Sequence, residues 1–246
     1  MKRIGFWACL WWLALPAQAF EWQYNALLAQ QAQGFKSVAD QSRFAAKVFT
    51  FEHADGWAYG SNFLSVDMTV PERGDHQFYG EFSPSLSWKK LFALSALPVW
   101  LKDVSFTATW EKGEYAEAKL IGLGVDLNLP DWDFLKLALY QRYSSSDFYA
   151  GDQGSAPQLT VVWVRDFSTG RVNWLFEGFM DYAWAESTLG RSDRMLIQPR
   201  LMVDIGAWWD QPKHWWFGVE HNYWHNKYGV KGVDESVTQA AIKWQF

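Results

Sequence analysis

The sequence predicts an all-β fold: a transmembrane antiparallel up-and-down β-barrel of about 12 strands, preceded by a cleaved N-terminal signal peptide. Three observations support this prediction. The chain opens with an export signal, runs of alternating polarity recur along it, and its last run ends in an aromatic residue, Phe246. No later stretch is long and apolar enough for a membrane helix. A membrane-spanning chain of this kind must therefore close into a barrel, because only helices and closed barrels hydrogen-bond every backbone group in hydrocarbon.

The first 19 residues have the layout of a secretory signal peptide. Lys2 and Arg3 precede an uncharged stretch over residues 4–15, and Ala17-Gln18-Ala19 supplies the small residues of a cleavage site. The 12 residues of that stretch are too few for a membrane anchor, which needs about 20. We expect a signal peptide over residues 1–19 and one outer-membrane barrel domain over residues 20–246.

The composition excludes several classes of protein. The 246 residues include 18 Trp, 10 Tyr and 18 Phe, an aromatic content that argues against a disordered chain or a coiled coil. Cleavage after Ala19 removes Lys2, Arg3 and the single cysteine, Cys9, and leaves 20 basic and 27 acidic residues. An acidic chain is not a nucleic-acid binder. A chain without cysteine has no disulfide, thiol nucleophile or cysteine-based zinc site.

Period-two alternation predicts the strands. In residues 62–70, Leu64, Val66 and Met68 lie on one face, while Ser65 and Asp67 lie on the other. Six further clear runs cover residues 78–88, 104–111, 135–142, 173–182, 195–205 and 239–246. Weaker runs at 22–31, 44–53, 120–129, 158–167 and 214–225 bring the total to about twelve. About ten residues per run suit a tilted membrane strand.

One strand and one connection do not fit the pattern cleanly. In residues 158–167, Val162 and Val164 compete with Leu159, Val161 and Trp163 for the apolar face, so the inward face stays unassigned. With both termini at the periplasmic end, the connection at residues 89–102 is an inner turn. It is long for one, and has room for a short helix. The other expected inner turns lie near residues 55–56, 130–131, 168–170 and 210–212, and the outer loops near 34–41, 71–75, 112–114, 144–156, 185–193 and 226–235.

A soluble β-sandwich would also alternate, so a second feature must separate the two folds. The apolar faces often end in Trp or Tyr, as at Trp88, Trp110, Tyr143, Trp174, Tyr182 and Trp244. Aromatic girdles at the two membrane interfaces account for this placement. Many outer-membrane barrels end in an aromatic strand that the barrel assembly machinery reads, and Phe246 fits that role. These features favour a barrel in the bacterial outer membrane, in contact with its lipid.

Three segments resemble a known family. They are Phe49-Thr50-Phe51-Glu52-His53-Ala54-Asp55-Gly56-Trp57-Ala58-Tyr59-Gly60, followed by Asn62-Phe63 and Val66-Asp67; Tyr79-Gly80-Glu81-Phe82-Ser83-Pro84-Ser85-Leu86-Ser87; and Tyr223-Trp224-His225. Together they resemble the nucleoside-specific channel-forming porins of the outer membrane (Tsx-like). The resemblance implies a monomeric twelve-stranded barrel with a narrow, selective channel for nucleosides. It transfers no individual ligand contact to this chain.

A twelve-stranded barrel lies between the filled eight-stranded barrels and the wide porins, so we expect side chains of the lumen to touch the solute. Aromatic and charged inward residues suit a flat, polar, neutral solute such as a nucleoside, with no cofactor. An ion-pair network that braces the barrel is the alternative role for each inward charge. The candidate solute-binding residues are Glu52, Asp67, Tyr79, Glu81, Tyr140, Arg142, Glu177, Phe179, Asp181, Arg200, Asp204, Glu220, Asn222 and Trp224.

Metal binding and catalysis on lipid are two alternatives to a channel. On a strand, His221 and His225 stand about 13 Å apart, too far to share a metal ion, so we expect no metal site. A barrel enzyme acting on lipid, such as a phospholipase or a lipid A modifying enzyme, needs a serine beside a lipid-facing histidine. The strand serines Ser65, Ser83, Ser85 and Ser105 fall on the lumen face instead, and no G-x-S-x-G motif is present. We therefore expect a channel rather than an enzyme. The loops are too short to favour an adhesin.

Overall fold

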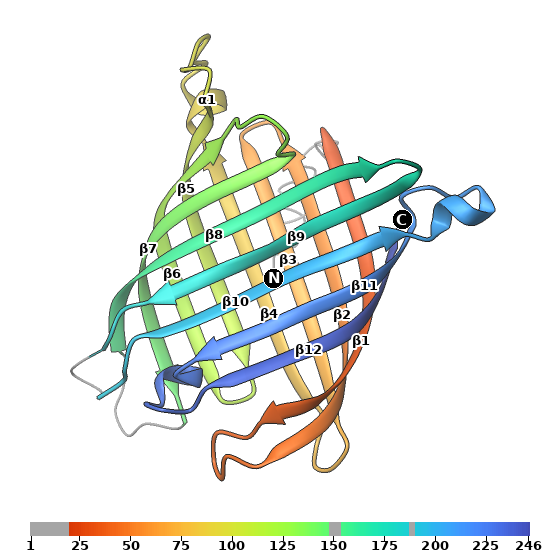
Figure 1. Ribbon diagram of the computed structural model, residues 1–246. Coiled ribbons are helices and arrows are strands. Elements are labelled where there is room, and N and C mark those ends of the chain that lie inside the picture. The colour runs from red at the N-terminus through yellow and green to blue at the C-terminus, as the bar shows by residue number, and fades with distance from the viewer. Residues whose placement is uncertain (1–19, 148–153, 187–189) are drawn as a thin grey trace, which may run out of the picture.

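The computed structural model describes residues 20–147, 154–186 and 190–246. Twelve strands form one closed barrel in which each strand pairs with its neighbours in sequence and β12 pairs with β1 (Figure 1). The paired strands run antiparallel throughout the barrel. The predicted fold and strand number are confirmed, whereas the expected signal peptide lies outside the described residues.

Each run expected from the sequence falls on its own strand, and most strands reach further at one end or both, but five runs extend one or two residues past their strand, at residues 88, 128–129, 205, 214 and 246. The elements are β1 (Trp22–Lys36), β2 (Arg43–Trp57), β3 (Gly60–Pro71), β4 (Gln77–Ser87), α1 (Trp88–Leu91), β5 (Leu101–Gly113), β6 (Ala116–Leu127), β7 (Phe134–Ser146), β8 (Gly154–Thr169), β9 (Val172–Ala183), β10 (Arg194–Asp204), η2 (Gly206–Trp209), β11 (Trp215–His225), η3 (Lys227–Gly229) and β12 (Glu235–Gln245). The short helix α1 occupies the long connection at residues 89–102. No helix in the described part of the chain is long and apolar enough to cross a membrane.

Alternation along each strand separates an outer wall from a lumen. On β6, Leu120 is 2% exposed and the next residue, Ile121, is 67% exposed. On β7, Leu139 is 57% exposed and the next residue, Tyr140, is 7% exposed. Since successive side chains of a strand point to opposite faces, the exposed apolar set lies on the outer wall and the other set faces the barrel interior.

The register decides the inward face of β8, which the sequence left open. Val162 pairs with Lys136 of β7 and with Phe179 of β9, both on the lumen face. Directly opposed residues share one face of a sheet, so Val162 faces the lumen and Trp163 lies on the outer side of the wall. The lumen therefore has an apolar section on β8 that the polar pattern of the other strands does not predict.

The seam between the first and last strands is the least paired part of the barrel. β1 and β12 share six register pairs, from Ala26–Gln245 to Gln31–Ala240, whereas β1 and β2 share fourteen. Beyond Gln31, an apolar cluster of Ala32 and Phe35 from β1, Ala46 from β2 and Val237 from β12 packs beside the seam. The Glu235 carboxylate closes the outer end of the seam by accepting the Lys36 backbone N–H.

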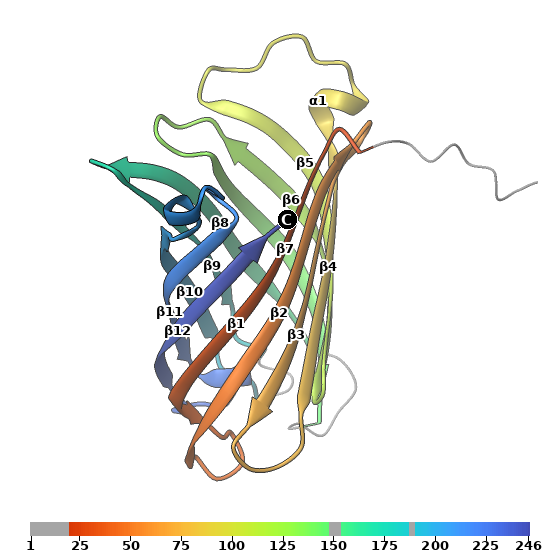
Figure 2. The same ribbon diagram turned by 90° about the vertical axis from the view of Figure 1, so that its right-hand side faces the viewer.

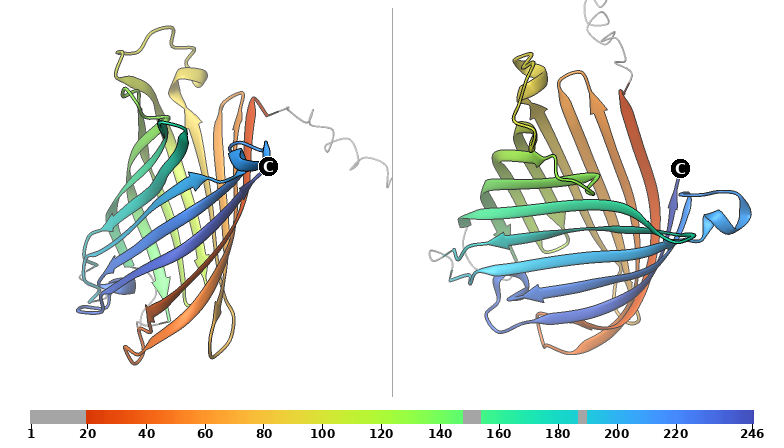
Figure 3. Two further views of the ribbon diagram at one scale, coloured as in Figure 1. Left: turned by 45° about the vertical axis from the view of Figure 1, so that its right-hand side comes forward. Right: turned by 45° about the horizontal axis from the view of Figure 1, so that its top comes forward.

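The two ends of the barrel carry different connections. The two ends of the described chain, before β1 and after β12, lie at one end of the barrel, together with the β2–β3 and β8–β9 turns, α1 and η2 (Figures 1 and 2). Backbone bonds tie these termini to the sheet, from Phe246 N–H to the Asn25 oxygen and from Glu21 N–H to the Gly56 oxygen. The loops with η3 and the long β9–β10 connection lie at the opposite end (Figure 3).

Candidate functional site in the barrel lumen

The register places all fourteen predicted residues on the lumen face. Cross-strand pairs connect them along the wall, as in Asp67 with Tyr79, Arg200 with Glu177, and Trp216 with both Lys243 and Asp204. Their inward orientation is therefore a property of the sheet rather than of single side chains. Nine of them fall into a cluster in the middle of the lumen, a belt along another part of the wall, and a group near the loops; the other five are Asp67, Tyr79, Tyr140, Phe179 and Asp204.

The central ion-pair cluster consists of Glu52, Glu177, Arg200, Glu220 and Lys243. Arg200 bonds Glu220 at 2.7 Å, Glu177 at 2.7 Å and Glu52 at 3.3 Å. Lys243, which is 0% exposed, bonds Glu177 at 2.6 Å. The five side chains come from β2 and β9 to β12, so one ionic contact reaches across residues that are 148 apart in sequence. Two cations hold three carboxylates, which leaves this wall acidic.

The polar belt consists of Glu81, Glu111, Arg142, Gln158 and Asp181. Arg142 binds Glu111 through two parallel hydrogen bonds of 2.9 and 2.7 Å, the strong bidentate geometry of guanidinium and carboxylate. Arg142 also donates to Gln158 at 2.9 Å, and Gln158 donates to Asp181 at 3.1 Å. Glu81 stands directly beside Glu111 in the register. The belt thus runs from β4 to β9.

Several lumen carboxylates have no cation partner among the described residues. Asp67, Glu81 and Asp181 make no ion pair within 4.0 Å, although Ser83 donates to Glu81 at 2.6 Å. Tyr79 pairs with Asp67 across the sheet and lies two residues from Glu81. An aromatic ring is therefore flanked by two carboxylates that can accept hydrogen bonds from a solute.

Near the outer loops, the predicted residues are committed to local packing. Asn222 and Lys227 both donate to Glu235, at 2.8 and 2.6 Å. The Trp224 ring lies 4.6 Å from that of Tyr228, and Lys227 stands over Trp224 at 5.2 Å. Burial raises the pKa of Tyr228 to about 12, so its hydroxyl stays neutral. This group fixes the β11–β12 loop against the barrel.

Two further predicted residues, Asp204 and Phe179, differ in how much the rest of the protein engages their side chains. Asp204 is 2% exposed and accepts the backbone N–H groups of Ala207 and Lys213 at 3.1 and 3.0 Å. It therefore shapes the β10–β11 turn, a structural contribution that competes with any contact to solute. Phe179 is half-buried on the lumen face of β9, where its ring is available to a passing molecule.

Sequence reasoning missed three lumen residues that make central contacts: Lys243, Glu111 and Gln158. Each lies in the polar phase of its strand, and for β5 and β12 the alternation of the sequence already placed Glu111 and Lys243 opposite the apolar face. What the sequence did not contain was the pairing, because Lys243 of β12 and Glu177 of β9 come together only when strands β9 to β12 assemble into one curved sheet.

The sequence of the chain matches a known family of channel proteins over most of its length. Residues 72–246 match a sequence model of a family described as "Nucleoside-specific channel-forming protein, Tsx". The chain belongs to the Tsx family. This Tsx-family protein is therefore a channel-type β-barrel of the bacterial outer membrane.

Solved structures resemble the Tsx-family chain in fold. The KdgM porin aligns with a TM-score of 0.50 at 13% identity, covering 92% of this chain and 99% of that chain. The NanC porin aligns with a TM-score of 0.48 at 10% identity, covering 89% and 98%. At such identities the KdgM likeness supports the barrel fold alone. No curated protein sequence matches the chain.

Three polar side chains, His221, Ser236 and Thr238, lie together on the outer wall of the Tsx-family barrel. His221 lies on the outer wall while its neighbour Glu220 faces the lumen, so the two side chains point to opposite faces of β11. No group of three potential metal ligands occurs within residues 20–147, 154–186 and 190–246. Sequence analysis placed the strand serines in the lumen, but Ser236 lies on the outer wall with its Oγ 3.3 Å from His221 Nε2. Thr238, rather than a carboxylate, contacts His221 Nδ1 at 2.9 Å.

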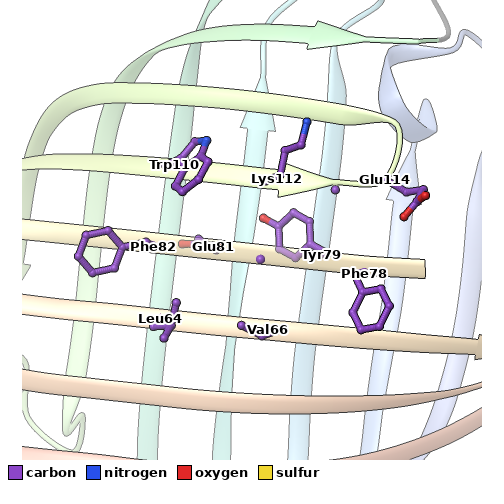
Figure 4. A pocket seen from close by; sticks show the side chains of 11 residues that line it. Leu64, Val66, Phe78, Tyr79, Glu81, Phe82, Trp110, Lys112 and Glu114 are labelled. Carbon is purple, nitrogen blue, oxygen red and sulfur yellow. The ribbon is translucent and has the colours of Figure 1, made fainter. Parts of the chain in front are cut away.

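A hollow in the wall around Gly80 also lies outside the lumen. It is lined by outward side chains of β3 to β5, including Val66, Phe78, Phe82 and Trp110, while Tyr79 of the same strand points to the other face (Figure 4). The hollow is lined mainly by apolar side chains. The hollow is therefore separate from the polar lumen.

Proposed function

We propose that this Tsx-family channel conducts nucleosides by facilitated diffusion. The observation that supports this most directly is Tyr79 between Asp67 and Glu81, because a nucleoside presents a flat base and a hydroxylated sugar. Stacking of a base on an aromatic ring contributes about 1–3 kcal/mol in nucleic-acid proteins. Carboxylates without a cation partner can accept the ribose hydroxyls.

The path combines this site with weaker contacts further along. Tyr140, Phe179 and Arg142 extend aromatic and polar surface from β4 toward β9, so a solute leaving Tyr79 meets further partners. Conduction requires binding that is repeated and weak enough for release. Several shallow sites along the polar belt satisfy this requirement better than one deep pocket.

The acidic lumen also bears on which solutes pass. The central ion-pair cluster holds three carboxylates against two cations, and Asp67, Glu81 and Asp181 add further negative charge. A phosphate group entering this field is repelled. The proposed substrate class is therefore the uncharged nucleoside rather than the nucleotide.

Uptake into proteoliposomes tests the proposal at its central residue. Tyr79→Ser removes the ring, and we expect saturable uptake of radiolabelled adenosine to show a roughly tenfold higher half-saturation constant, as the loss of one stacking contact predicts. Phe78→Ser, at the neighbouring position on the lipid face, is the matched control and leaves this constant unchanged. Equal effects of the two substitutions, or uptake that never saturates, would contradict the proposal.

A lipid-acting barrel enzyme is the competing function. His221 and Ser236 are adjacent on the outer wall, but Thr238 takes the position in which a hydrolase places an orienting carboxylate or amide. Purified barrel incubated with phospholipid should release no fatty acid. Turnover that disappears in His221→Ala would support the enzyme instead. The monomeric state and recognition of Phe246 by the assembly machinery stay proposals.

A further inference from the structure

The β4–β5 loop, residues 88–100, exposes an apolar surface that the channel does not use. Leu91 is 39% exposed, Phe92 60%, Leu94 37%, Val99 88% and Trp100 56%. Contiguous exposed apolar patches of this kind mark sites that meet another molecule or a membrane. The loop extends past the neighbouring strand ends, at the end of the barrel where residue 20 lies (Figures 1 and 2).

The loop is held in a defined shape by hydrogen bonds at both of its ends. At the start of α1, the Ser87 hydroxyl accepts the Lys90 backbone N–H at 3.0 Å. At the other end, Asn128 donates its backbone N–H to the Trp100 oxygen and its side-chain N–H to the Val99 oxygen, each at 2.8 Å. The fold therefore displays these apolar side chains on a fixed platform.

The exposed surface is continuous with the lipid-facing wall of the barrel. The Trp88 ring lies 5.1 Å from that of Phe106, which is 46% exposed on the outward face of β5, and 6.2 Å from that of Phe92 in the loop. An unbroken apolar surface thus leads from the hydrocarbon-facing strands to the loop, which places the loop at the membrane boundary.

The charge of the loop complements an anionic lipid surface. The loop and the first two residues of β5 contain Lys89, Lys90 and Lys102 and no acidic residue. The Lys90 ammonium is engaged, because it donates to Glu21 and to the Trp57 oxygen at 2.6 Å each. The side chains of Lys89 and Lys102 are exposed and have no ion-pair partner in the described part of the chain.

We infer that the β4–β5 loop is an interfacial lipid-binding element. Its apolar side chains enter the periplasmic leaflet of the outer membrane, and Lys89 and Lys102 bind the phosphates of anionic phospholipids. The even number of strands brings both termini and this loop to one end, which faces the periplasm. Aromatic and basic residues gather at such interfaces because rings suit the headgroup level and ammonium groups bind lipid phosphates.

Fluorescence quenching in lipid nanodiscs tests the inference. Val99→Cys, in the mature chain that otherwise lacks cysteine, carries a polarity-sensitive dye. The barrel is reconstituted with phosphatidylcholine, phosphatidylglycerol, and one of the two lipids spin-labelled at its headgroup. We expect blue-shifted emission and stronger quenching by the phosphatidylglycerol probe, with a preference of about fivefold per lysine at low salt. In the double variant Lys89→Glu/Lys102→Glu, this preference falls to one.

Lys231→Glu, an exposed lysine in the β11–β12 loop at the opposite end, is the charge-matched control and keeps the preference. Emission typical of water, with no quenching by either lipid, would overturn the inference. Equal quenching by both lipids in the unmodified loop would overturn the assignment of Lys89 and Lys102. Burial of the dye only after a soluble periplasmic protein is added would assign the surface to a protein partner instead.

Discussion

Arg200 shows how a single residue organises the lumen. It bonds Glu52, Glu177 and Glu220 from three different strands, and its side chain is 12% exposed. A paired charge in a poorly solvated site is strongly coupled to its partners, because removing one partner leaves the others uncompensated. Arg200 and its carboxylate partners therefore brace the barrel, and only the atoms at the edge of the central ion-pair cluster are free to contact a solute as well.

The stability of the barrel should depend on this residue. Arg200→Met leaves three carboxylates with Lys243 as their one remaining cation in the cluster, and we expect a loss of about 3–5 kcal/mol in the free energy of unfolding. Denaturant unfolding in lipid vesicles, followed by tryptophan fluorescence, measures it. Lys231→Met, on an exposed loop, should change stability by less than about 0.5 kcal/mol. Matching values for the two variants would show that the cluster does not brace the barrel.

At the scale of the element, two strand glycines differ in how closely the neighbouring strand approaches them. A Cβ added at Gly122 on β6 would lie 2.0 Å from the backbone oxygen of Leu139, whereas one at Gly80 on β4 would have no neighbour nearer than 3.9 Å. Gly122 is therefore needed for the approach of β6 to β7. Gly80 instead leaves the hollow in the outer wall.

We expect Gly122→Ala to destabilise the barrel by about 1–3 kcal/mol, the usual cost of overpacking. Gly80→Ala, also within a strand, is the matched control and should fold with unchanged stability. The same vesicle unfolding assay compares the two. A neutral Gly122→Ala, or an equal loss at Gly80, would contradict the close β6–β7 contact.

The strands show which parts of the structure can be predicted from the sequence. Alternation placed Glu81 and Arg142 in the lumen and Trp110 on the lipid face, because a period of two is set by the strand itself. It left β8 undecided, since Val162 and Val164 are apolar on the lumen face. It did not give the Glu52–Arg200 contact, which depends on closure of β1 onto β12.

For the whole molecule, the balance of lumen charge should set ion selectivity. Asp67, Glu81 and Asp181 face the lumen without a cation partner, so the field inside is negative and should attract cations. In a potassium chloride gradient across a planar bilayer, we expect a reversal potential on the cation-selective side. Glu81→Gln/Asp181→Asn should move it toward zero, while the outward Phe78→Leu should not. Anion selectivity of the unmodified channel would contradict the charge assignment.

The central claim is that the closed twelve-stranded wall encloses a narrow, solute-binding path. Single-channel recording of the purified barrel in a planar bilayer tests it most directly. We predict small conductance steps that adenosine interrupts in a concentration-dependent way and adenosine monophosphate interrupts far less. A large conductance that adenosine leaves unchanged, or no conductance at all, would contradict it.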